Sequence, residues 1–394
     1  MKKYIKVLLI ISGCLVLSGG IMLSAGVALG GRPGFVITRD GVRSEDKEGD
    51  FIEKEEEDLR NITSLDLKSW SGNIEIVESD KFKVEYGYWE DYTDPLYEII
   101  DGKLTLKLSE KRGYRQSVFT GVYFGGSWEG KNKEDYIKLY VPSNIKFEEI
   151  LIDSKYNDLH MNAVDTKQLI LKADYSDISL DGIKAGSMDI SSGYGELQAK
   201  NCSFQMADLK MDYGNAKLSD SEIGETQIAA KYGEVYISSV KAGSLKVGAD
   251  YGTVSIKDVI NTNDKKELET LELSAEYGDL ELNHVKAETL SLNAESGNVS
   301  SNEVTIGTGV IQGDYCDMRF RELTVQNLDV EDDYGDIRLE LTGDEDDYDF
   351  LLKAGYGEIS LNGSNTEGTL ERQKNRKNSI SVKGDSSDIT IHTN

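Results

Sequence analysis

The chain has 394 residues, of which 38% are hydrophobic, and a formal net charge of −27. So acidic a protein is not expected to bind nucleic acid, because neutralising phosphates requires clustered Lys and Arg. It contains 39 glycines but only three prolines, which suits long stretches of strand because every backbone N–H stays available for pairing.

The first predicted element is a membrane anchor. Lys2, Lys3 and Lys6 precede an uncharged stretch from Val7 to Leu29. As a helix these 23 residues would span about 35 Å, enough to cross a hydrocarbon core of about 30 Å. The lysines orient the short tail toward the cytoplasm. We therefore predict that residues 1–30 are a cytoplasmic tail and transmembrane helix of a single-pass cell-membrane protein, with the bulk of the chain extracellular.

Two alternatives stay open for this segment. The sequence ISGC at 11–14 resembles a lipoprotein cleavage box, in which Cys14 would carry the lipid. Cleavage after Ala28 or Gly30 would instead make the segment a secretory signal. The other two cysteines, Cys202 and Cys316, are predicted to be buried or incidental thiols, because three cysteines cannot make a disulfide framework.

Two further segments precede the regular part of the chain. Residues 31–58 are polar and end in EKEEED, which predicts a solvated acidic linker. Residues 59–150 contain strand-like runs such as GNIEIVE and KLTLKLS, joined by turns of variable length. We predict that residues 59–150 form the N-terminal capping coils of a β domain and cover its first strand edges.

A short phrase recurs through residues 151–394, as in DYGDIRL at 333 and GYGEIS at 355. Eight of the eleven steps between successive copies have the same length, and a period this strict is the signature of a solenoid. Serine marks two copies, at Ser296 and Ser386. Tyrosine marks the others: Tyr156, Tyr175, Tyr194, Tyr213, Tyr232, Tyr251, Tyr277, Tyr315, Tyr334 and Tyr356.

Within each copy the apolar residues alternate, which is the period of a strand and not of a helix. Around Tyr251, for example, Leu245 and Val247 come before the marker, and Val254 and Ile256 follow it. Two strands, a turn and a short third strand fit one period at about 3.3 Å per residue. We predict an all-β protein, a parallel β-solenoid of about 19 residues per coil, whose final phrase DSSDITIHTN closes the C-terminal end.

The marker tyrosines are predicted to form a structural ladder. Equivalent residues of neighbouring coils lie about 4.8 Å apart, so the rings can stack on one another. Glycine follows the marker in eight of the twelve copies, which indicates either a positive φ or a tight approach of the backbone to the ring. Asn157, Ser176, Cys316 and Ser387 occupy the same place, so we favour the tight approach.

The sequence offers no catalytic pattern. It contains no GxSxG, HExxH or CxxC motif. The three histidines, His160, His284 and His392, lie in different coils at mostly outward positions. We predict no catalytic residue and no cofactor.

Acidic residues flank the marker on both sides and would form a carboxylate-rich edge when the coils stack. One interpretation is a low-affinity calcium site or a trap for cationic peptides. The other is that the acids only stabilise turns through hydrogen bonds to the backbone. The candidate ligands are Asp250, Glu276, Glu295 and Asp314.

The ordered set of MKKYIKVLLI, SGNIEIVE, KLTLKLSE, the YGDI-type phrases and the closing SSDITI resembles a bacterial envelope family. Its members are described as domains of unknown function, adhesin-like proteins or β-strand repeats, and some are membrane-anchored products of cell-envelope-stress operons in Gram-positive bacteria. The resemblance covers about residues 60–394 and brings no catalytic residues. It implies an adhesin-like or envelope-stress accessory protein. The partners we predict are cationic peptides or calcium, from the acidic edge, or envelope polymers. The alternative is a carbohydrate-active β-helix enzyme at the cell surface.

Overall fold

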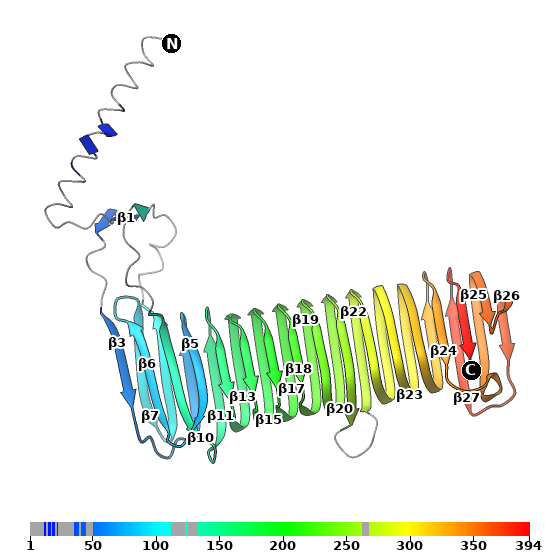
Figure 1. Ribbon diagram of the computed structural model, residues 1–394, viewed down its shortest axis with the longest axis horizontal. Helices are drawn as coiled ribbons and strands as arrows, with labels where there is room; N and C mark the ends of the chain where they lie inside the picture. Colours follow the sequence, from blue (N-terminus) through cyan, green and yellow to red (C-terminus); the bar gives the residue numbers. More distant parts are fainter. Residues whose placement is uncertain are drawn as a thin grey trace, which may run out of the picture.

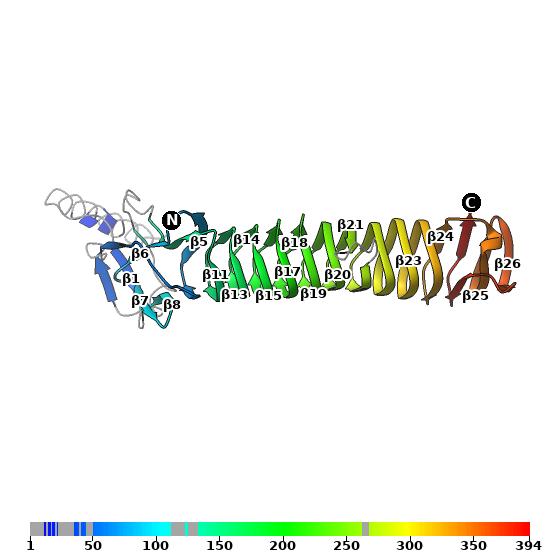
Figure 2. The same cartoon turned by 90° about the horizontal axis from the view of Figure 1, so that it is seen from below.

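The computed structural model describes residues 12, 15, 16, 18, 19, 22, 35–38, 41–44, 50–111, 123–124, 133–261 and 268–394. This part of the chain is nearly all β and forms an elongated rod (Figures 1 and 2). No helix among these residues is long and apolar enough to span a membrane. Most of the predicted anchor, Val7–Leu29, lies outside the described residues.

Two sheets account for the described strands. A three-stranded antiparallel sheet consists of β1 (Phe35–Thr38), β2 (Gly41–Ser44) and β9 (Tyr123–Phe124). A 25-stranded sheet forms the rod, with a single short 3-10 helix η1 (Glu345–Asp347) beside it in the described part. Its strands are β3 (Phe51–Glu56), β4 (Ser64–Ser69), β5 (Gly72–Ser79), β6 (Lys83–Trp89), β7 (Thr93–Ile100), β8 (Lys103–Glu110), β10 (Asp135–Pro142), β11 (Lys146–Ser154), β12 (Leu159–Asn162), β13 (Asp165–Tyr175), β14 (Ile178–Asp181), β15 (Lys184–Tyr194), β16 (Leu197–Lys200), β17 (Ser203–Tyr213), β18 (Ala216–Ser219), β19 (Glu222–Tyr232), β20 (Val235–Tyr251), β21 (Val254–Asn261), β22 (Leu268–Tyr277), β23 (Leu280–Asp332), β24 (Ile337–Leu341), β25 (Tyr348–Leu361), β26 (Ser364–Arg372), β27 (Asn378–Gly384) and β28 (Ile389–Thr393).

The regular coils stack in parallel. The strands that end at the marker tyrosine form one face of the rod, on which β13, β15, β17 and β19 pair side by side. Leu169 lies opposite Met188, and Met188 lies opposite Ala207. Each of these partners is one repeat period further along the chain. The residues inserted before β22 lengthen one step of the repeat, yet Tyr251 still pairs with Tyr277. The insertion therefore leaves the marker column in register.

The core follows from the alternation of side chains along each strand. In β22 the side chains of Leu271, Leu273 and Ala275 are buried, and the residues between them face solvent to different degrees. The buried side chains of successive coils form one continuous core along the rod. This arrangement leaves the marker residues at a corner, outside the core.

A second corner depends on left-handed backbone, a feature that was not predicted from the sequence. One residue per coil, seven positions after the marker, has φ between 49° and 55° in most of the regular coils. These residues are Ala163, Asn201, Asp220, Ser239, Asp258, His284, Glu303 and Glu322. Gly182 holds the same place with φ of 67°. None of them is β-branched, which fits the steric cost of this region for branched side chains.

The final phrase does not close the C-terminal end, so that prediction was wrong. Ile389 of β28 pairs with Ile337 of β24 on one side and with Ile359 of β25 on the other. In Figure 1 the red C-terminal strands accordingly lie between β24 and the orange β25. The outer edge of β25 is covered instead by β26, which runs antiparallel to it and is mostly exposed. A short polar strand of this kind protects the sheet edge from further pairing.

The N-terminal end is built in a related way. Leu106 of β8 lies between Leu67 of β4, in parallel, and Tyr97 of β7, in antiparallel pairing. On the neighbouring face β10 lies between β5 and β6. Strand β3, within the segment predicted as an acidic linker, pairs with β6, and the Phe51 and Trp89 rings lie 5.2 Å apart. At both ends, therefore, one coil is inserted out of sequence order.

Candidate functional site

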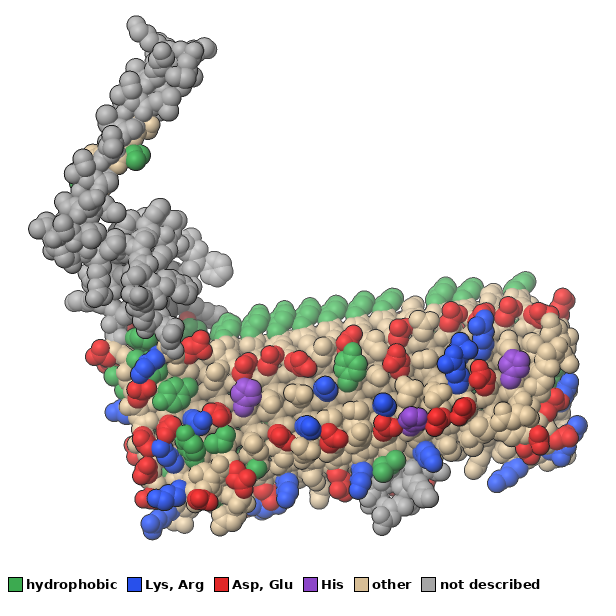
Figure 3. Space-filling view, in the orientation of Figure 1, with side chains coloured by type: hydrophobic (Ala, Val, Ile, Leu, Met, Phe, Trp, Pro, Cys, Tyr) green, Lys and Arg blue, Asp and Glu red, His purple; other side chains and the backbone are tan. Residues whose placement is uncertain are grey.

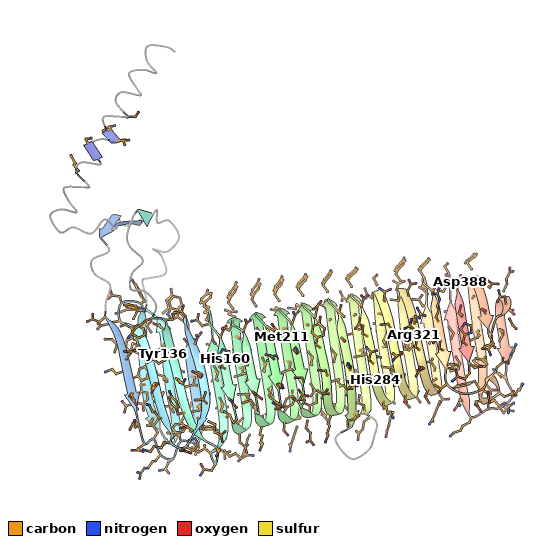
Figure 4. All side chains as sticks on the ribbon, viewed as in Figure 1. Tyr136, His160, Met211, His284, Arg321 and Asp388 are labelled. Atoms are coloured by element: carbon orange, nitrogen blue, oxygen red, sulfur yellow. The ribbon has the colours of Figure 1, made fainter. Side chains whose placement is uncertain are left out.

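The marker tyrosines form an exposed column of stacked rings along one edge of the rod (Figures 3 and 4). From Tyr156 to Tyr277, successive ring centroids are 4.6–5.4 Å apart and the ring planes are inclined by 2–14°. Tyr315 and Tyr334 stack in the same way at 4.9 Å. Apart from Tyr356, which is 84% exposed, the column tyrosines are 42–58% exposed. Each ring thus hides its faces against its neighbours and presents its edge to solvent.

The glycines beside the rings allow the coils to approach this closely. A Cβ atom added at Gly233 would lie 2.0 Å from the carbonyl oxygen of Gly214, and one at Gly214 would lie 1.9 Å from that of Gly195. The contact is between backbones of adjacent coils and does not involve the ring. Gly195 and Gly214 have φ of +129° and +151°, so the positive-φ explanation applies to them, whereas the favoured approach of backbone to ring was wrong: the close approach is between backbones. Where Cys316 replaces glycine, its side chain is buried and donates to the Ala294 carbonyl oxygen at 3.2 Å.

Acids directly precede eight of the twelve markers and lie beside the ring column. The pKa of Tyr251 is raised. Partial loss of solvent around the hydroxyl raises this pKa most. Electrostatic interactions raise it further, first those with the neighbouring rings Tyr232 and Tyr277 and then those with the carboxylates of Glu276 and Asp250, because these acids lie near its ring. Some of these acids are paired, as Asp212 is with Lys231 at 2.6 Å. This part of the edge therefore combines aromatic rings with negative charge.

The acids two positions after the markers accept hydrogen bonds from the backbone. Asp177 Oδ1 accepts the backbone N–H of Glu196 at 2.8 Å, and Asp279 Oδ1 accepts that of Asn298 at 2.8 Å. Asn215 Oδ1 does the same for Glu234 at 2.8 Å. These bonds join equivalent positions of neighbouring coils. At these positions the side chains bond backbone N–H groups, as the turn-stabilising interpretation expects, but these N–H groups belong to the next coil and not to the same turn.

The comparison with known families decides the assignment. The Toastrack DUF4097 family model matches residues 62–257 and 234–375. The chain belongs to the Toastrack DUF4097 family. The assignment confirms the resemblance seen in the ordered motifs, and no curated protein matches the chain.

Two solved structures show partial similarity to this Toastrack protein. One is a putative adhesin from Bacteroides fragilis, with 12% identity, 72% of this chain and 97% of that chain covered, and a TM-score of 0.27. The other is a putative cell adhesion protein from Clostridium sporogenes, with 12% identity, 88% and 100% coverage, and a TM-score of 0.15.

The Toastrack coils show no compact metal site. No group of three or more His, Cys, Asp or Glu side chains in the described ranges is arranged to hold a metal ion. The candidate ligands Asp250, Glu276, Glu295 and Asp314 belong to four successive coils, one in each. His284 is exposed, and its hydrogen bond with Asp258, 2.9 Å long, raises its pKa.

A shallow groove of about 500 Å³ runs across the face of the Toastrack rod formed by the strands that end at the marker tyrosines. Exposed Met206 lines it together with four acids and one lysine, and the lysine and two of the acids are paired. Lys246 lies 2.8 Å from Glu272, and Lys210 bonds Asp208 at 2.6 Å, which raises the pKa of Lys210. A lysine held protonated in this way is not suited to act as a general base.

Two features of the Toastrack edge were missed in the sequence. The ammonium of Lys155 lies 5.8 Å from the centroid of the Tyr156 ring, at the N-terminal end of the column. Asp332 lies beneath the column, 1% exposed, at a place that several coils fill with alanine. Its Oδ1 has no hydrogen-bond partner in the described part, and burial raises its pKa to about 6. An acid two residues after Val330, where the alternation expects an apolar side chain, was the available signal.

Proposed function

We propose that this protein is a non-enzymatic, membrane-anchored, extracellular β-solenoid that holds a partner along its tyrosine edge, in an adhesin-like or envelope-stress accessory role. The observation that carries the proposal is the column of half-exposed rings, which is unbroken from Tyr156 to Tyr277. Extended aromatic surface of this kind is uncommon on proteins that act alone and is typical of interaction sites. Rings already stacked in place lose little freedom when a partner binds.

The charge of the edge indicates the kind of partner. The chain carries a net charge of −27, and acids precede most of the markers. A negative edge attracts positively charged peptides or polymers and speeds their encounter. The same carboxylates would attract calcium only weakly, because no cluster in the described ranges offers a full set of ligands.

A carbohydrate-active β-helix enzyme is the alternative function. It requires acids and a cation that converge on a substrate, and the one lysine that lines the groove across the coils, Lys246, is paired with Glu272 instead. We therefore favour a binding role over catalysis.

The location can be tested on intact cells. Protease added from outside should remove the β domain and leave an unprocessed N-terminal fragment in the membrane, because residues 1–30 would be shielded. A cytoplasmic marker protein should stay intact in the same cells, and permeabilised cells serve as the control. A mature protein that begins near residue 29, or at a lipidated Cys14, would contradict the anchor.

The binding role can be tested with the purified full chain. Titration calorimetry with a lysine- and arginine-rich peptide should show binding that weakens as salt is added, since the attraction is between exposed charges. A glutamate-rich peptide of equal length is the control and should not bind. Lack of binding to the cationic peptide at low salt would overturn the proposal.

A further inference from the structure

The ring column has a gap at Ser296. Tyr277 pairs directly with Ser296 in the register of the two coils. The next coil follows at once, because the Cys316 thiol donates to the Ala294 carbonyl oxygen, and that coil carries Tyr315. The break is visible in the green ridge of Figure 3, toward its C-terminal half.

The gap lies between two ring faces. Neighbouring column rings are mostly 4.6–5.0 Å apart, so Tyr277 and Tyr315, two coils apart, are separated by about 10 Å. A planar group needs about 3.5 Å to each ring, which this spacing accommodates. Tyr315 is 58% exposed, more than the 42–52% of the rings that are stacked on both faces, and Tyr277, at 51%, lies within that range. The additional exposure of Tyr315 is consistent with one uncovered face.

The surroundings of the gap are strongly negative. Glu276, Glu295 and Asp314 directly precede the three positions that form it, and Glu295 and Asp314 are exposed. The stretch 287–318 contains five acidic residues and no Lys, Arg or His. The local chain therefore supplies negative charge without a cation of its own to balance it.

The other end of the column shows what such a ring face accepts. At Tyr156, where no further tyrosine follows, the ammonium of Lys155 lies 5.8 Å from the ring centroid. That distance is within the range of a cation–π contact. The residue that holds Lys155's place is acidic in all three coils around Ser296. None of these three coils therefore supplies a cation to the gap.

We propose that the gap over Ser296 binds the guanidinium group of an arginine presented by a partner protein. Its plane would lie between the Tyr277 and Tyr315 rings, about 5 Å from each centroid, within cation–π distance of both. Glu295 would accept its N–H groups at the open edge. A guanidinium is planar and weakly hydrated, whereas an ammonium is compact and strongly hydrated, so arginine is preferred to lysine. The site rests on the proposed function, in which the tyrosine edge faces the partner.

A second serine offers an internal control. Ser386 lies between Tyr334 and Tyr356, because its N–H bonds the Asp333 carbonyl oxygen and the Tyr356 N–H bonds that of Asp385. The Tyr356 ring is 84% exposed and has no stacking partner among the described residues. One wall of this second gap is therefore poorly placed, and it is not expected to hold a planar cation.

The test places a tyrosine side chain in the gap over Ser296. Ser296→Tyr would complete the column, and tyrosine is the residue that most coils carry there, so the fold should be kept. Binding of the blocked tripeptide Gly-Arg-Gly to the full chain is followed through the ring signals of selectively labelled tyrosine. Wild type should bind it several-fold more tightly than Gly-Lys-Gly. Ser296→Tyr should weaken arginine binding at least tenfold, Glu295→Gln several-fold, and Ser386→Tyr less than twofold.

Other outcomes separate this site from the general function. If the chain binds polycationic peptides but Ser296→Tyr leaves Gly-Arg-Gly binding unchanged, the arginine site is wrong and the proposed function stands. Equal binding of Gly-Lys-Gly, or tighter binding of Gly-Trp-Gly, would also overturn the guanidinium assignment. If wild type binds neither polycations nor the arginine tripeptide, both proposals fail.

Discussion

Replacing Gly233 by alanine is expected to lower the free energy of unfolding by about 3 kcal/mol, at the upper end of overpacking effects. The new Cβ would lie 2.0 Å from the carbonyl oxygen and 2.7 Å from the carbonyl carbon of Gly214 in the next coil. Both atoms are backbone, and the strands on either side of each glycine are paired with neighbouring coils. Relief therefore requires the two coils to separate, which also loosens the ring stack.

Gly243→Ala is the matched control, because its Cβ would meet Gly224 at 3.4 Å, an ordinary contact. Both variants change glycine to alanine between adjacent coils of the same region. Urea unfolding followed by circular dichroism should show a lower midpoint for Gly233→Ala only. Equal midpoints for the two variants would show that the coils are not packed as closely as described.

Replacing Asp332 by asparagine is expected to stabilise the protein at neutral pH. Burial raises the pKa of this carboxyl from 3.8 to about 6. A raised folded-state pKa means that the folded chain holds the proton more tightly than the unfolded chain. Its contribution to stability is therefore fully present below about pH 4 and is lost as pH rises through 6. At pH 7 the penalty approaches about 3 kcal/mol, at 1.36 kcal/mol per pKa unit.

The measurement is the unfolding midpoint between pH 4 and pH 7.5. Asp332→Asn should be more stable than wild type at pH 7, by about 1–3 kcal/mol, with little difference at pH 4. Asp332→Ala, which introduces the residue that several coils carry there, should show the same trend. Asp329→Asn removes an exposed acid from the same strand and should change little. A pH dependence that all variants share would mean that Asp332 is not the responsible group.

The regular coils could be predicted because their signals are local and repeated. The alternation around Tyr251 and the even spacing of the markers determine which side chains face the core and which fall at the corner. The left-handed corner could also have been found, since Asn201 and Asp220 are residues that tolerate positive φ.

The ends of the rod could not be predicted from the same signals. A repeat shows how one coil fits on another, but it does not show which coil comes next in space. Strand β28 has the pattern of any other coil, and its insertion between β24 and β25 depends on pairings between residues far apart in the chain, such as Ile337 with Ile389. For this reason the gap at Ser296 could be read from the sequence, whereas the one between Tyr334 and Tyr356 required the structure.

The sequence predicted that acids flank the tyrosines at this edge. It did not predict that the acids before and after the markers make different contacts. The acids before and after the markers look alike in sequence. In the structure Asp177 and Asp279 bond the backbone of the next coil, whereas Glu276 and Glu295 remain beside the rings. The difference arises from side-chain direction at the turn, which the one-letter pattern does not contain.

The most direct test of the account compares two variants of equal charge in the cationic-peptide titration. The edge variant combines Asp250→Asn, Glu276→Gln, Glu295→Gln and Asp314→Asn. The control neutralises four exposed acids at the left-handed corner with Asp220→Asn, Asp258→Asn, Glu303→Gln and Glu322→Gln. We expect the edge variant to bind the peptide several-fold more weakly and with a flatter salt dependence, while the control binds as wild type does. Equal losses in the two variants, or no loss in either, would contradict a binding role for the tyrosine edge.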